Sequence, residues 1–269
     1  MVADEQQPGG ALKRHGVRIA IAGGTGIAGR YAVRAARGAG HETVVLTRHS
    51  GVDLTTGKGL DTALRGVQAI IDASNTPERK AAPATEFFTA VARRLQEVGA
   101  RNGAGRIVVL SVLGIDDIPY GYYQAKLAQE AAAREGPVPV SVLRSTQFYE
   151  FAGQVLARRR FGPVALAPRM VLQPIAARTV GEILVEEATS AVAGGCTEVA
   201  GPVREYLPDM VQMTVHRHGK RAMVLPFTLR GEAGAAMRDG ALLPPDGVRL
   251  AGPTFVDWLD GPDPLEVTR

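Results

Sequence analysis

The sequence predicts an α/β fold, a doubly wound parallel sheet with helices on both faces and a small C-terminal lobe. Apolar runs alternate with helical patterns over the first 150 residues, which is typical of a parallel sheet. An Ile-rich run also leads directly into a glycine-rich turn and an Ala-rich helical stretch. After residue 150, Pro and Gly interrupt the chain often, so we expect a smaller lobe over the ligand edge of the sheet.

The expected elements follow from these patterns. In the first part we expect strands at 17–22, 42–46, 69–73, 106–111 and 140–144, and helices at 28–38, 60–65, 83–98 and 122–134. In the second part we expect a short apolar segment at 170–175 and helices at 179–193, 205–218 and 229–238. We divide the chain into a tail at 1–16, a sheet domain at 17–150, and a substrate lobe at 151–269 from which some segments rejoin the sheet.

The composition is that of a soluble globular protein, with 45% hydrophobic and 22% charged residues in a chain of 269. The one cysteine, Cys196, excludes an internal disulfide. No apolar run approaches the roughly 18 residues that span a membrane, and residues 1–16 lack the apolar core of a signal peptide. We expect a cytoplasmic monomer or homodimer with no membrane partner.

The charges and histidines exclude two further classes of site. The net charge of +4 comes from 31 basic and 27 acidic residues that are dispersed along the chain, so we expect no nucleic-acid partner. The one dense basic cluster, at 158–160, is either a solvated helix end or a contact for an anionic ligand. The five histidines lack the spacing of zinc ligands, so we expect no metal.

The glycine-rich turn after the first strand predicts dinucleotide binding. Its pattern is Gly23-x-x-Gly26-x-x-Gly29. In such a turn Gly23 and Gly26 let the backbone approach a pyrophosphate at the helix N-terminus, and Gly29 lets helix and strand pack closely. Thr25 and Ile27 complete the expected contacts. The alternative is an ordinary turn between a strand and a helix.

The residues after the second strand predict NADP as the cofactor, with NAD as the alternative. Arg48 places a cation where an acidic residue would favour NAD, and no acid lies between residues 44 and 52. Arg48 could instead be an ordinary surface residue. Asp53 and Leu54 follow, and either they contact the adenine or Asp53 caps a turn.

Small residues end the third strand, where they would let the diphosphate and ribose pass. We expect Ala73 and Ser74 to contact the cofactor through their backbone. The neighbouring Asp72 is either a helix-capping residue or a structural acceptor.

A Tyr-x-x-x-Lys string predicts a proton donor. Tyr122 and Lys126 are four residues apart on an expected helix and therefore share a face. An ammonium near a phenol lowers the phenol pKa from about 10, which makes Tyr122 a usable general acid for a carbonyl that receives hydride. Lys126 can also hold the nicotinamide ribose.

Together these residues resemble a known family. The resemblance is carried by the glycine turn, Arg48, Asp53-Leu54, the strand ending at Ser111, Tyr122-x-x-x-Lys126 and Leu143-Arg-Ser-Thr-Gln-Phe-Tyr149. Over residues 17–260 the chain resembles the atypical short-chain dehydrogenases/reductases, and among them the bacterial NmrA-like group. The resemblance implies a Rossmann fold whose dinucleotide-binding domain is 17–150, a bound NAD(P), and a lobe that closes over the substrate.

The same resemblance implies residue roles. Tyr122 would be the general acid, with Lys126 as its partner and ribose ligand. Thr146, Gln147 and Phe148 would border the nicotinamide and the substrate. Ser111 would orient the carbonyl, although competent relatives usually carry their Ser or Thr just past the strand, one position later.

Two functions follow from these expectations. The first is an NADPH-dependent oxidoreductase that acts on a small carbonyl, enone, quinone or imine, with Tyr122 as proton donor and the nicotinamide as hydride source. The second is a non-catalytic NAD(P)-binding redox sensor of the NmrA type, which the early position of Ser111 favours. Retention of both Tyr122 and Lys126 favours the enzyme.

Overall fold

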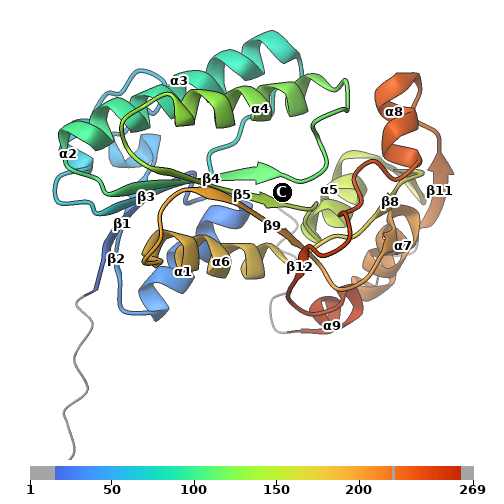
Figure 1. The fold of residues 1–269 in the computed structure, drawn as a ribbon. Helices are drawn as coiled ribbons and strands as arrows, with labels where there is room; N and C mark the ends of the chain where they lie inside the picture. Colours follow the sequence, from blue (N-terminus) through green and yellow to red (C-terminus); the bar gives the residue numbers. More distant parts are fainter. Residues whose placement is uncertain (1–15, 220–221, 262–269) are drawn as a thin grey trace, which may run out of the picture.

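A seven-stranded parallel sheet forms the centre of the protein (Figure 1). The computed structural model describes residues 16–219 and 222–261, so the expected tail lies outside the described residues except for its last position. The strand order is β12-β9-β5-β4-β3-β1-β2, and every pairing between neighbours is parallel. The strands are β1 (Arg18–Ala22), β2 (Glu42–Leu46), β3 (Ala69–Asp72), β4 (Arg106–Val112), β5 (Val140–Ser145), β9 (Gly195–Ala200) and β12 (Arg249–Leu250). The expected α/β fold is confirmed.

Helices cover both faces of this sheet, and apolar contacts hold them there (Figure 1). One face carries α1 (Ile27–Gly38) and α6 (Ala177–Thr189), and the other carries α2 (Leu60–Ala63), α3 (Ala81–Arg101) and α4 (Gly121–Arg134). The central strands are buried on both faces, so β1 and β3 read as continuous apolar runs apart from Asp72 and the first residue of β1. Their carboxyl ends meet at one edge, where ligands bind in sheets of this kind.

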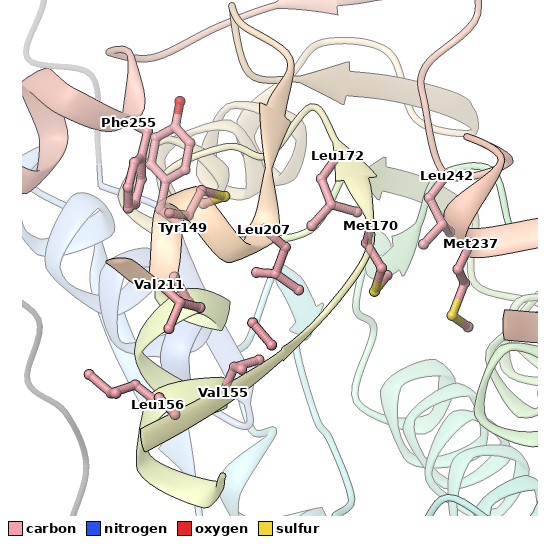
Figure 2. Packing of buried hydrophobic residues seen from close by; sticks show 14 of the residues in the cluster. Tyr149, Val155, Leu156, Met170, Leu172, Leu207, Val211, Met237, Leu242 and Phe255 are labelled. Carbon is pink, nitrogen blue, oxygen red and sulfur yellow. The ribbon is translucent and has the colours of Figure 1, made fainter. Parts of the chain in front are cut away.

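The rest of the chain forms a lobe beside that edge, with its own apolar core (Figures 1 and 2). Its helices are α5 (Glu150–Arg158), α7 (Leu207–Arg217), α8 (Gly231–Arg238) and α9 (Phe255–Asp260). Its strands are β6 (Arg160–Phe161), β7 (Val164–Pro168), β8 (Val171–Leu172), β10 (Glu205–Tyr206) and β11 (Met223–Phe227). Figure 2 shows the core of the lobe, where Leu207 and Val211 face Val155.

Among the aromatic side chains of the lobe, Tyr149 is fully buried. Its ring contacts Phe255 and Trp258, and its hydroxyl donates to Pro253 O at 2.8 Å. These contacts tie the start of α5 to the C-terminal helix α9. No helix in the described part of the chain is long and apolar enough to cross a membrane.

Candidate functional site

The glycine turn joins β1 to α1 at the ligand edge of the sheet. Gly23 has φ +72°, and a Cβ there would lie 2.3 Å from Ala73 O at the end of β3. A Cβ on Gly29 would lie 2.1 Å from Gly23 O. Both glycines are therefore required for close backbone packing. This is the role expected for Gly29. For Gly23, which was expected to make room for a pyrophosphate, the close contact is with the backbone of the protein itself.

Gly26 differs from its two partners. Its backbone is extended, with φ −76°, and its N–H donates to Gly23 O at 2.8 Å. A Cβ at Gly26 would contact one atom within 4 Å, Gly23 O at 3.1 Å, and otherwise meet open space. Thr25 is exposed and Ile27 half-buried beside it.

The N-terminus of α1 has the features of an anion-binding helix end. Gly26 is its N-cap, no side chain caps it, and no acidic residue lies in its first turn. The first N–H groups of a helix have no partner within the helix and carry the positive end of its dipole. A phosphate at this position would satisfy both.

Arg48 lies at the same edge, two residues past β2. Leu46 pairs with Ala22, the last residue of β1, so the turn after β2 lies beside the glycine turn. Thr47 caps this turn by accepting a hydrogen bond from Ser50 N at 3.1 Å. Arg48 is exposed, and its NADP-discriminating role stays a prediction.

Asp53 closes a turn. Its Oδ1 accepts hydrogen bonds from Thr55 N, Thr55 Oγ1 and Thr56 N at 2.9, 2.7 and 3.1 Å. These bonds lower the pKa of the carboxyl to about 2, the one to the Thr55 hydroxyl contributing most. The structure thus shows the turn-capping alternative. The adenine contact of Asp53 and the half-buried Leu54 stays a prediction.

Three buried hydroxyls lie at or near the carboxyl ends of adjacent strands: Ser74 after β3, Ser111 in β4 and Thr146 after β5. Within residues 16–219 and 222–261, none of the three oxygens has a hydrogen-bond partner. Buried polar groups in native proteins are nearly always paired, so these three oxygens are candidate contacts for a ligand, and their expected roles stay predictions. Ala73 is buried beside Ser74.

Ser111 lies inside β4, which continues to Val112, one residue beyond the expected end. Side chains alternate along a strand, so Ser111 faces the same side as Val109, which packs in the apolar cluster of α3 and α4. Ser111 therefore shares a side of the sheet with Tyr122 and Lys126 of α4.

Phe148 is half-buried, and its backbone forms an isolated bridge with Ile175.

Tyr122 is half-buried on the first turn of α4, and its hydroxyl donates to Asn75 Oδ1 at 3.0 Å. Phe88 packs edge-on against its ring, and the guanidinium of Arg79 lies over the ring at 4.6 Å. Burial raises the pKa of the phenol, and the charge of Arg79 opposes that rise.

Lys126 is buried one turn further along α4. Its ammonium donates to Leu110 O at 2.6 Å and to Gln129 Oε1, and lies 4.7 Å from the centre of the Phe88 ring. Burial lowers its pKa to about 8, against the opposing charges of Asp72 and Glu130. The expectation that Lys126 lowers the Tyr122 pKa is therefore wrong here. The two residues share a helix face, but the ammonium is bonded toward the sheet and the phenol toward Asn75.

Sequence reasoning missed three residues around this pair. Asn75 and Arg79 lie in the loop between β3 and α3, and their contacts with Tyr122 join segments far apart in sequence. Gln129 could have been found, because positions 122, 126 and 129 fall on one helix face. In the described residues no group of three or more His, Cys, Asp or Glu could hold a metal ion.

No family model and no curated protein sequence matches this chain. Solved structures do match. MoeE5 in complex with UDP-glucose and NAD has a TM-score of 0.69 at 17% identity, covering 89% of this chain and 95% of its own. A short-chain dehydrogenase/reductase superfamily protein from Agrobacterium tumefaciens with bound NAD has a TM-score of 0.65 at 18% identity, covering 90% and 95%. The chain has the Rossmann-type fold of these proteins.

A third neighbour carries the name of a reductase. A dTDP-4-dehydrorhamnose reductase from Clostridium acetobutylicum has a TM-score of 0.66 at 13% identity, covering 87% of this chain and 95% of its own. At such identities the likeness concerns the fold, and the substrate of this chain has to be argued from its own residues.

Proposed function

We propose that this protein is an NADPH-dependent oxidoreductase that reduces a small organic carbonyl, enone, quinone or imine, with Tyr122 as the proton donor. One observation carries the proposal. A glycine turn at an uncapped helix N-terminus, three buried unpaired hydroxyls and the helix face of half-buried Tyr122 and buried Lys126 lie at one edge of a parallel sheet. Tyr122 also packs against the apolar core of the lobe, which supports an uncharged substrate.

The residues present fit a dinucleotide. The N-terminus of α1 would hold the pyrophosphate, because a Cβ at Gly26 would meet little but open space. Arg48 would bind the ribose phosphate of NADP, and the backbone of Ala73 and Ser74 would line its path. Lys126 would donate to a ribose hydroxyl, while Thr146 would lie beside the nicotinamide.

When bound, the reduced nicotinamide supplies the hydride. The residues of this chain supply orientation and the proton. The raised pKa of Tyr122 keeps a proton on Oη at neutral pH, and Asn75 Oδ1 holds that hydroxyl in place. The phenolate that remains after transfer is stabilised by Arg79 over the ring. Ser111, on the same side of the sheet, would donate to the substrate oxygen.

The test has two parts. NADPH titration by calorimetry measures binding, and loss of NADPH absorbance with a panel of quinones, ketones, enones and imines measures turnover. UDP-glucose is added to the turnover assay as a competitor of the panel substrates, because MoeE5 binds it. Binding together with turnover of a panel member supports the proposal, whereas absence of NADPH binding contradicts it.

One observation favours a second function, a non-catalytic NAD(P) sensor. The Lys126 ammonium is bonded to Leu110 O and Gln129 rather than directed at Tyr122, so the pair is not arranged as a proton-transfer unit. A sensor would bind NADPH and NADP⁺ with different affinities and leave every substrate of the panel unchanged.

A further inference from the structure

A chain of buried hydrogen bonds connects the ends of β3 and β4 through α4. Ser74 N donates to Asp72 Oδ1 at 3.0 Å, and Gln129 Nε2 donates to Asp72 Oδ2 at 2.7 Å. Gln129 Oε1 accepts from the Lys126 ammonium, which also donates to Leu110 O at 2.6 Å. Asp72, Gln129 and Lys126 are exposed by 1%, 0% and 4%. Such a network is expensive to break, because each unpaired member would be buried.

Asp72 and Lys126 fix the direction of the hydrogen bonds in this network. A carboxylate only accepts hydrogen bonds and an ammonium only donates them. Gln129 must therefore present its NH₂ to Asp72 and its oxygen to Lys126. The amide thus lies between two groups of opposite charge. It accepts one N–H of the ammonium and Leu110 O accepts a second, so two of the three N–H groups are in use.

We infer that Gln129 is a positioning residue. Its amide, itself anchored on Asp72, holds the Lys126 ammonium against Leu110 O and leaves the third N–H of the ammonium for a hydroxyl of the bound ligand. The inference rests on the proposed function for the identity of that ligand, a cofactor ribose. Gln129 itself lies one turn behind Lys126 and is fully buried, so it acts through the lysine.

The charged and aromatic groups around Lys126 do not hold its ammonium in place as Gln129 does. The groups of opposite charge that act on the ammonium are Asp72 from β3 and Glu130 from α4. Glu130 is bonded to Arg144 through both carboxylate oxygens, each at 3.0 Å. From α3 the ammonium meets the ring of Phe88, and Tyr122 lies one turn before it on the same helix.

A swap of acid and amide tests the chain of hydrogen bonds. In Asp72→Asn alone, the side chain at position 72 keeps one oxygen for two donors, Ser74 N and Gln129 Nε2. In Gln129→Glu alone, the carboxylates at positions 72 and 129 face and repel each other. In the double variant the amide at position 72 still accepts from Ser74 N, and it donates to the carboxylate at position 129, which accepts from Lys126. We expect both single variants to lose stability in urea unfolding and the double variant to regain most of the loss. Additive losses would overturn the inference.

The position of the ammonium has its own readout. The sequence has five lysines, Lys13, Lys58, Lys80, Lys126 and Lys220, so the NMR signal of Lys126 can be assigned with Lys126→Met. The swap moves a negative charge into contact with the ammonium, so the pKa of Lys126 should rise by about one unit or more. An unchanged pKa would mean that position 129 does not contact the ammonium.

NADPH titration then tests the link to the ligand. Gln129→Met should weaken NADPH binding by about ten- to a hundredfold, the value of one charge-assisted hydrogen bond. Gln124→Met, an exposed position on α4, is the matched control and should change nothing. Equal affinity of Gln129→Met and the native protein would overturn the positioning role. Failure of the native protein to bind NADPH would refute the proposed function and leave the swap result intact.

Discussion

The hydroxyl of Tyr122 donates a hydrogen bond to Asn75 Oδ1 at 3.0 Å, and the two residues are 47 positions apart in the sequence. This bond and the burial of the ring give Tyr122 a neutral, oriented phenol. In the proposed function this hydroxyl would donate its proton to the substrate in place of Asn75 Oδ1. Lys126, one turn away, is bonded to the sheet.

Removal of the phenol oxygen should separate chemistry from binding. Tyr122→Phe should reduce turnover by about 10²–10⁴-fold, the usual contribution of a general acid, with NADPH affinity unchanged. Tyr123→Phe is the control, because the buried Tyr123 ring packs in the core of the lobe. Steady-state rates with the best panel substrate give the answer. Unchanged turnover would remove Tyr122 from the mechanism.

Lys126 should make stability depend on pH. Its folded-state pKa of about 8 lies below the ordinary 10.5, so the unfolded chain binds more protons between these values. Stability should therefore rise with pH across this window, and Lys126→Met should lack that rise. Urea unfolding at a series of pH values measures it. The exposed Lys80, changed to Met, should retain the native pH profile.

Arg48 should discriminate between the cofactors. A charge-assisted contact with the ribose phosphate contributes about 1.5–3 kcal/mol. Arg48→Ala should thus weaken NADPH binding by roughly one to two orders of magnitude and leave NADH binding nearly unchanged. Parallel titrations with both cofactors compare these effects. Equal losses for both would show that Arg48 is not the discriminator.

Gly29 should matter for folding. A Cβ there would lie 2.1 Å from Gly23 O and 2.8 Å from Gly24 Cα, so Gly29→Ala must push α1 away from β1. We expect a loss of about 1–3 kcal/mol in the free energy of unfolding. Gly38→Ala, on the same helix with no atom within 4 Å of the added Cβ, should be neutral or stabilising. Denaturant unfolding of both variants compares them; similar stabilities would contradict the packing role.

Local patterns predicted the first half of the fold well and the second half less well. The expected strands β1 to β5 agree with the structure to within one residue at each end, because each is an apolar run between clear turns. β9 was missed, because its first residues are exposed and only Val199 and Ala200 are buried. Helix α5 was also missed, and the expected helix at 205–218 begins with strand β10.

In the site, too, local features could be predicted from the sequence and long-range contacts could not. The spacing of the glycines and of Tyr122 and Lys126 is local, so the turn and the shared helix face were predictable. The partners of those side chains were not. Asn75 and Asp72 reach α4 across the fold, and side-chain bonds between distant segments leave no periodic signal in the sequence.

The central claim is that the glycine turn binds a dinucleotide, and Gly26 tests it most directly. Gly26 has an ordinary φ of −76°, and its added Cβ would meet one atom of the protein, at 3.1 Å, so Gly26→Val should keep the fold. The side chain would occupy the position of the pyrophosphate. Calorimetric titration of NADPH into native protein and Gly26→Val, with circular dichroism of both, should show binding by the native protein and none by a folded variant. A folded Gly26→Val protein with near-native affinity for NADPH would contradict the account.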